Sequence, residues 1–127
     1  MKILYSFEYV QKIYETFKDN ILIFEATDSD GNIHAMNFYI ADNRSVYYLM
    51  SGADPDLRSS GAQNKIHWEA IKHFYGRVKY FDFEGSMIEN VEANFRKFGG
   101  VQKQYFSISS TSIPREVKKI VRMLLKK

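Results

Sequence analysis

Two acidic side chains, Asp82 and Glu84, lie two residues apart in the segment Tyr80-Phe81-Asp82-Phe83-Glu84-Gly85-Ser86-Met87. The alternation of aromatic and acidic residues predicts a strand over residues 79–84. Both carboxyl groups would face the same side of the sheet on that strand. A buried carboxyl group there would have a raised pKa and could act as a general base toward an amine.

Glu84 is the better candidate for such a base, because it would lie at the carboxyl end of the strand, where ligands collect in open sheets. Asp82 is better suited to holding a neighbouring loop by hydrogen bonds. The alternative is that both carboxylates are structural.

Other catalytic and metal-binding patterns are absent from the sequence. The chain has no cysteine, which excludes disulfides, thiolate zinc sites and a cysteine nucleophile. His34, His67 and His73 do not have the spacing of metal ligands, so no metal site is expected. No nucleophile elbow, Rossmann fingerprint or Walker loop occurs.

The composition is that of one globular domain. The 127 residues are 45% hydrophobic and 26% charged, and we expect residues 1–127 to form a single domain. No apolar run approaches the length of a membrane span, and the first residues lack a signal-peptide core. A cytoplasmic location is therefore expected.

The formal net charge of +3 is unevenly distributed. Residues 113–127 carry a net charge of +5 and the remainder carries −2. The basic excess thus belongs to one terminal segment, where a solvated helix face explains it, and nucleic-acid binding is not favoured.

Hydrophobic periodicity and turn residues predict an α+β domain with the element order αβββαβαβα. We expect a mixed, mostly antiparallel sheet flanked by helices. A buried strand at 21–26 would begin an antiparallel meander, and the strand at 79–84 would pair in parallel with the strand at 46–50. The expected helices are 6–20, 62–75, 88–98 and one beginning near Ser112, and the expected strands are 21–26, 33–41, 46–50, 79–84 and 101–109.

Several segments in this order resemble the GNAT acyltransferase superfamily, in its FemAB-like (peptidoglycan-bridge) branch. The resemblance covers about residues 20–109. The segments that carry it are Ala26 to Ala35, Tyr48-Leu49-Met50-Ser51-Gly52, Trp68-Glu69-Ala70-Ile71-Lys72, the octapeptide from Tyr80, and Phe95-Arg96-Lys97-Phe98-Gly99-Gly100.

The resemblance implies transfer of an acyl group from acyl-CoA, as a cosubstrate and not a permanent cofactor, to an amine acceptor. The family binds the pyrophosphate of the carrier on the loop that enters the central helix, a general kind of anion site. That loop corresponds here to Arg58-Ser59-Ser60-Gly61-Ala62-Gln63, in which Gln63 replaces a small residue of the family pattern. The implied donor-binding residues are Ser51, Gly52, Arg58, Ser60, Gly61, Ala62 and Gln63.

Three catalytic roles are expected for this reaction. The backbone of Ser51 and Gly52 would polarise the thioester, and Glu84 would be the base. Peptidoglycan-bridge enzymes carry a Phe-Lys pair near the transferred group, and Phe95 stands here where they often have lysine, so that role moves to Arg96. The alternative for this segment is a core stripe of Val91, Phe95 and Phe98.

Two further readings stay open. FemAB-like relatives take an aminoacyl-tRNA donor instead of acyl-CoA. The chain also lacks the usual first strand and helix of the family, with only residues 2–5 to replace that strand. Residues 21–27 would then form an open sheet edge, which favours a non-catalytic remnant that forms a homodimer or binds a partner chain.

Overall fold

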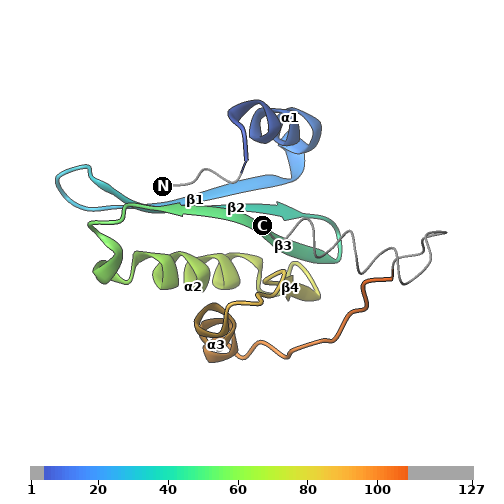
Figure 1. Cartoon of the computed structure of the whole chain (residues 1–127). Helices are drawn as coiled ribbons and strands as arrows, with labels where there is room; N and C mark the ends of the chain where they lie inside the picture. Colours follow the sequence, from blue (N-terminus) through green and yellow to red (C-terminus); the bar gives the residue numbers. More distant parts are fainter. Residues whose placement is uncertain (1–4, 109–127) are drawn as a thin grey trace, which may run out of the picture.

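A four-stranded mixed sheet with the strand order β1-β2-β3-β4 forms the centre of the chain. The computed structural model describes residues 5–108 (Figure 1). The expected α+β class is confirmed, and the described residues follow the order αβββαβα. The elements are α1 (Phe7–Phe17), η1 (Lys18–Asn20), β1 (Ile21–Thr27), β2 (Ile33–Ala41), β3 (Ser45–Ala53), η2 (Arg58–Ser60), α2 (Ala62–Phe74), β4 (Tyr80–Asp82) and α3 (Glu89–Lys97).

The predicted meander and the parallel crossover are both confirmed. Strands β1, β2 and β3 pair antiparallel, and β4 pairs in parallel with β3 after the α2 crossover. Both hairpin turns are held by an aspartate that accepts backbone hydrogen bonds. Asp28 accepts from the N–H groups of Asp30 and Asn32, and Asp42 accepts from the two N–H groups that follow Asn43. Short polar side chains of this kind specify turns through local bonds.

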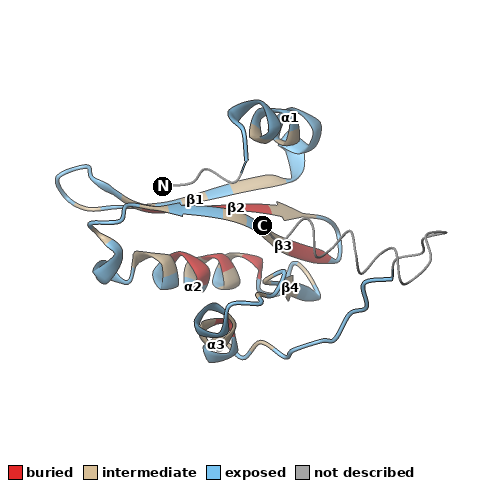
Figure 2. Ribbon diagram, viewed as in Figure 1, coloured by how far each residue is buried: buried red, intermediate tan, exposed pale blue. Residues whose placement is uncertain are grey.

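The buried core lies between α2 and one face of the sheet (Figure 2). Helix α2 presents Ile66, Ala70 and Phe74 to the sheet at the spacing of one helix face. The strands contribute Ala35, Tyr39 and Val46 to the same cluster. Gly76, with φ of 75°, ends this helix as expected.

The opposite face of the sheet is covered only in part. Helix α1 lies on that side (Figure 1), capped by Ser6 as predicted, but none of its residues is buried. Its first apolar residue, Phe7, is 80% exposed. Strand β1 is the edge of the described sheet and contains no fully buried residue, so the expectation of a buried strand at 21–26 is wrong. Its outer backbone groups have no strand to pair with among the described residues.

The strand expected at 79–84 ends earlier than the sequence predicts. Strand β4 stops at Asp82, whose Oδ1 accepts a hydrogen bond of 2.8 Å from the N–H of Glu84. Glu84 then adopts φ of 60° and Gly85 φ of 70°, which turns the chain out of the sheet. The two acids therefore do not share one strand face, and Asp82 holds the turn that follows its own strand where a bond to a neighbouring loop was expected.

The strand expected at 101–109 is also wrong over the residues that the structure describes. Residues 101–108 are exposed and pair with no strand of the described sheet. Ser109 and the terminal helix expected from Ser112 lie outside the described residues, as do all but the last residue of the segment 2–5. No helix within residues 5–108 is long and apolar enough to cross a membrane.

Candidate active site

Strands β3 and β4 are the last two strands of the described sheet, and they pair only over the first residues of β3. Their last paired residues are Tyr47 and Asp82. A bulge in β3 at the same level leaves Leu49 without a partner on β2, because Tyr39 pairs with Tyr48 and the preceding residue pairs with Met50. A bulge bends its strand, so a gap opens between the two strands beyond Tyr47.

Aromatic side chains pack against one another and fill the space between the separated strands, which we call the aromatic gap. Tyr48 and Phe83 follow the last paired residues on the two strands, and the ring of His67 from α2 lies 4.7 Å and 5.5 Å from them. Helix α3 adds Phe95, which stacks on Phe83 at 4.8 Å, and Phe98 follows at 5.9 Å. The gap therefore meets apolar walls on β3, β4, α2 and α3.

The amino terminus of α2 lies next to the end of β3. Gly61, at φ of 74°, turns the chain into the helix and supplies no capping side chain. The Oγ of Ser60 accepts from the N–H of Ala62 at the long distance of 3.3 Å. The first turn therefore retains backbone donors and the positive end of the helix dipole, which suit an anion.

Several of the predicted donor-binding residues come together here. Arg58, Ser60, Ala62 and Gln63 all line one small cavity of about 50 Å³, whose other walls are His34, Ala35, Ala53 and Leu57. Ser51 and Gly52 are exposed near the end of β3. Arg58 is exposed and forms no ion pair with any carboxylate in the described part of the chain. Its cationic head is thus available to a bound phosphate.

A buried hydrogen-bond chain joins this helix end to the sheet. Gln63 Nε2 donates both to Asn37 Oδ1 and to the hydroxyl of Tyr48, at 3.2 Å for the latter. The Tyr48 hydroxyl donates in turn to Ser51 Oγ. Asn37 is completely buried. The side chain of Gln63 therefore fixes the α2 terminus on the sheet, while its backbone remains part of the loop that resembles the family pattern.

The same chain continues to His67. Asn37 Nδ2 donates to the hydroxyl of Tyr39, and that hydroxyl lies 3.0 Å from His67 Nδ1. Burial raises the pKa of Tyr39 to about 12 and lowers the pKa of His67 to about 4. His67 is therefore neutral near pH 7.

The two candidate catalytic residues each follow an aromatic residue of the gap in the sequence, Glu84 after Phe83 and Arg96 after Phe95. Glu84 is exposed in the turn after β4, and partial burial, followed by the nearby charge of Asp82, raises the pKa of its carboxyl group. Arg96 is exposed and pairs with Glu92 at 2.6 Å on the surface of α3. Its neighbour Phe95 is buried, as the core-stripe interpretation expects.

Sequence reasoning missed the polar residues inside the core. Asn37, Tyr39 and Tyr48 were not assigned a joint role, and His67 was considered only as a metal ligand. A signal was present, since Asn37 and Tyr39 alternate on the core face of β2 and His67 follows the buried Ile66. No group of histidine and acidic side chains that could hold a metal ion occurs among residues 5–108.

Residues 4–92 match the family model described as the acetyltransferase (GNAT) domain. The chain belongs to this family. No curated protein matches it in sequence.

Solved structures share the fold. An acetyltransferase from Trypanosoma brucei is 10% identical and superposes with a TM-score of 0.63 over 86% of this chain and 82% of that one. A glucosamine-6-phosphate N-acetyltransferase from Arabidopsis thaliana is 11% identical, with a TM-score of 0.61 over 89% and 83%. At such identities the likeness establishes the GNAT fold alone.

The hydrogen-bond chain predicts an unequal effect of two neighbouring substitutions. Gln63→Ala removes the donor to buried Asn37 and to Tyr48, so we expect the free energy of unfolding to fall by about 1–3 kcal/mol in urea denaturation. Asn64→Ala is the matched control, because Asn64 is exposed and accepts only from Asn94 across the surface. Equal stabilities of the two variants would contradict a structural role for the Gln63 side chain.

Proposed function

We propose that this chain is an N-acyltransferase domain that transfers an acyl group from acyl-CoA to an amine. The observation that carries the proposal is the position of the α2 amino terminus against β3, where Gln63 Nε2 donates to the hydroxyl of Tyr48, the residue after the last one that pairs with β4. The helix terminus would supply donors for an anionic carrier, and the aromatic rings beyond the paired part of β3 and β4 would supply an apolar surface for an acyl chain. Membership of the GNAT family supports the same reaction class.

Different residues would contact different parts of acyl-CoA. The α2 terminus at Gly61, Ala62 and Gln63, with Ser60 and Arg58 beside it, would bind the pyrophosphate. The exposed backbone of Ser51 and Gly52 at the end of β3 would polarise the thioester carbonyl. The amine would then attack that carbonyl directly, a reaction that depends mainly on positioning and on stabilisation of the oxyanion.

Glu84 would accept the proton that the attacking amine loses. It lies two residues beyond the last pair of β4, and its raised pKa makes the carboxylate a stronger base. Arg96 would act on the developing negative charge only after leaving its surface pair with Glu92. We therefore assign the base to Glu84 first and Arg96 a secondary role.

The segments Tyr80 to Met87 and Phe95 to Gly100 support placement in the FemAB-like branch, with residues 1–127 acting as one cytoplasmic domain. The alternative donor in that branch is aminoacyl-tRNA. Binding of acetyl-CoA in the absence of RNA would favour the acyl-CoA donor. Binding of aminoacyl-tRNA alone would favour the other.

Acetyl-CoA binding tests the donor site. Saturating acetyl-CoA, at about 100 times its Kd, should stabilise the chain by about 2.7 kcal/mol and raise its Tm. Arg58→Ala should weaken that binding about tenfold in calorimetry, because one charge-assisted contact to phosphate is lost. The control is Arg77→Ala, which removes the same charge beyond the other end of α2. No Tm shift of the unsubstituted chain at millimolar acetyl-CoA would contradict the proposal.

The release of free CoA tests whether Glu84 acts as the base. The chain has no cysteine, so a thiol reagent detects only CoA freed from acetyl-CoA when primary amines are supplied. Glu84→Gln keeps the left-handed turn but removes the carboxylate, and we expect transfer to fall at least about a hundredfold. The wild-type rate should fall as the pH drops through the Glu84 pKa, and the variant should lack that dependence. Glu25→Gln is the control, and equal rates in both variants would remove Glu84 from the mechanism.

A second candidate function is self-association through the β1 edge. Within residues 5–108 no strand covers the outer side of β1, and Ile23 on the α1 face is 47% exposed. Two copies could pair these edges antiparallel, which is a self-complementary arrangement with twofold symmetry. If the chain is a non-catalytic remnant, this dimer formation would be its whole function. If the chain is an active enzyme, the dimer would be its assembled form.

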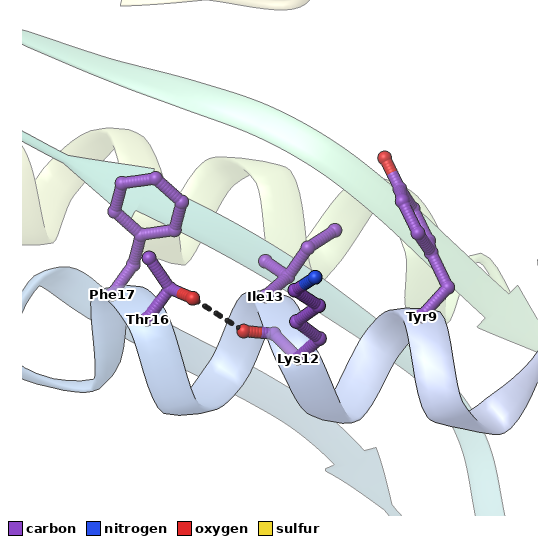
Figure 3. Close-up of a pocket in the computed structure, with 5 residues that line it drawn as sticks. All are labelled: Tyr9, Lys12, Ile13, Thr16 and Phe17. Atoms are coloured by element: carbon purple, nitrogen blue, oxygen red, sulfur yellow. Dashed lines mark hydrogen bonds between the residues drawn. The ribbon is translucent and has the colours of Figure 1, made fainter.

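Helix α1 supports that assembly because its apolar side chains form an open groove of about 290 Å³ (Figure 3). Tyr9, Ile13 and Phe17 point to one side of the helix, with Lys12 and Thr16 beside them (Figure 3). The second copy is the occupant we propose, since edge pairing would bring a second α1 to the same side. A different partner chain would instead leave the purified protein monomeric.

The molar mass in solution tests self-association through the β1 edge. Light scattering after gel filtration should give twice the 14.9 kDa mass of one chain. Ile23→Lys places a charge on the edge strand, and we expect it to shift the protein to the monomer. Tyr75→Lys changes an 86% exposed residue after α2 and should leave the dimer intact. A clean monomer of the unsubstituted chain at high micromolar concentration would contradict self-association.

A further inference from the structure

Tyr80, the first residue of β4, has three positively charged side chains around its ring. The guanidinium of Arg44 lies 5.5 Å from the ring centre, the ammonium of Lys79 lies at 5.4 Å and that of Lys103 at 5.8 Å. The three cationic residues are exposed, and Tyr80 itself is 41% exposed. Contacts of this kind between cations and an aromatic ring are attractive. We call these four residues the cationic patch.

Backbone hydrogen bonds fix most of this patch in place. The N–H groups of Lys79 and Tyr80 both donate to the carbonyl oxygen of Arg44, at 2.8 Å and 3.1 Å. Tyr80 also pairs with the first residue of β3. Lys103 comes from residues 101–108, which pair with no strand of the described sheet. The cationic patch thus joins the turn between β2 and β3, the start of β4 and the segment after α3.

The three cations have no acidic partner within the described part of the chain. Each charge lies within 5.8 Å of the same ring centre, so any two of them are less than about 12 Å apart. This separation is close to the Debye length of ~10 Å at 0.1 M salt, so the charges repel one another in solution. No ion pair of the described residues includes any of the three, whereas Lys65, Lys72 and Arg96 each pair with a glutamate. Asp42, the acid nearest to Arg44 in the sequence, accepts from backbone N–H groups instead.

Positive charge gathered around an exposed aromatic ring suits single-stranded nucleic acid better than other polyanions. Phosphates would attract the three cations, whose flexible stems allow them to leave the ring. A base would then stack on the ring of Tyr80, as bases do on aromatic side chains in sites for single strands. An acidic peptide would satisfy the charges without using the ring. The span of about 12 Å corresponds to about three nucleotides of a stacked strand, at ~3.4 Å each.

We propose that the cationic patch binds single-stranded nucleic acid, with phosphates on the three cations and a base on Tyr80. This site is separate from the proposed donor site. Arg44 directly precedes β3, and Gly52 lies eight residues further along the same strand, which is about 26 Å at ~3.3 Å per residue. The two sites can therefore be occupied together, and the inference does not rest on acyl transfer.

The distribution of charge along the sequence did not favour nucleic acid, because the residues outside 113–127 carry a net charge of −2. Such a count does not register which charges the fold brings together. Arg44, Lys79 and Lys103 are separated by 35 and 24 residues in the sequence, yet they surround one ring. The patch is a property of the folded chain.

Fluorescence anisotropy with a labelled oligothymidylate of about ten nucleotides tests the patch on the whole chain. Because residues 113–127 are also basic, variants are compared over a range of salt concentrations. The variant carrying Arg44→Gln, Lys79→Gln and Lys103→Gln should bind more weakly than the unsubstituted chain. Its slope of log K against log salt concentration should be shallower by about 2, since each phosphate contact contributes about 0.7.

The control variant carries Lys12→Gln, Lys18→Gln and Lys65→Gln, which remove the same charge from exposed positions of α1, η1 and α2. Its affinity and salt slope should stay close to those of the unsubstituted chain. An equal loss in the two triple variants would overturn the proposal, because net charge alone would then explain it. Undiminished binding by the patch variant, or no binding by the unsubstituted chain at low salt, would also overturn it.

The contact with a base is tested separately. Tyr80→Leu should weaken binding about tenfold without changing the salt slope, because stacking releases no counterions, and Tyr80→Phe should bind as the unsubstituted chain does. An abasic strand of the same length carries the same phosphates and should bind the unsubstituted chain more weakly. Equal affinity for the abasic strand would indicate a general anion surface and overturn the assignment to nucleic acid. If Tyr80→Leu does not fold, this comparison on the unsubstituted chain decides.

Discussion

The attachment of α2 to the sheet is the constraint on which the rest of the site depends. Gln63 is the only residue of the loop from Arg58 that sends a side-chain hydrogen bond into the buried part of the described sheet, where it meets Asn37. A buried polar chain is favourable only when every member is satisfied. In this chain of hydrogen bonds, one branch runs from Gln63 through Tyr48 to Ser51. The other runs from Gln63 through Asn37 and Tyr39 to His67. The helix terminus and the aromatic gap are therefore positioned by the same bonds.

This arrangement also explains a departure from the family pattern. A small residue at position 63 would leave the helix terminus open but would remove the bond to Asn37. Gln63 makes that bond with its side chain, while its backbone remains part of the first turn of α2. The proposed donor site and the proposed dimer contact use different surfaces of the chain, because α2 lies on one side of the sheet and α1 on the other (Figure 1).

Much of the fold could be predicted from the sequence because local signals agreed there. Ser6, Gly31, Asp42 and Gly76 each mark an element boundary through their own backbone or side-chain chemistry, and the meander follows from them. The end of β4 was missed because alternation at 79–84 continues past the turn that Asp82 imposes on Glu84. The exposed residues 101–108 carry an apolar composition typical of a strand, but pairing depends on a neighbour that composition does not reveal.

Only those parts of the candidate site that are continuous in the sequence could be predicted. The loop from Ser51 to Gln63 is continuous in sequence, so the resemblance could place it. The contact between Tyr39 and His67 joins residues 28 apart, and nothing local indicates it. Roles that depend on such contacts, including the neutral state of His67, become visible only when the strands and α2 are assembled.

The most direct test of the central claim is an amide NMR titration of the nitrogen-labelled chain with CoA. The account predicts that the largest shift changes fall on the backbone N–H groups from Ser51 to Gln63, at the end of β3 and the start of α2. Smaller changes should follow in the residues around Phe83. Changes confined to α1 and β1, or no changes at millimolar CoA, would contradict it.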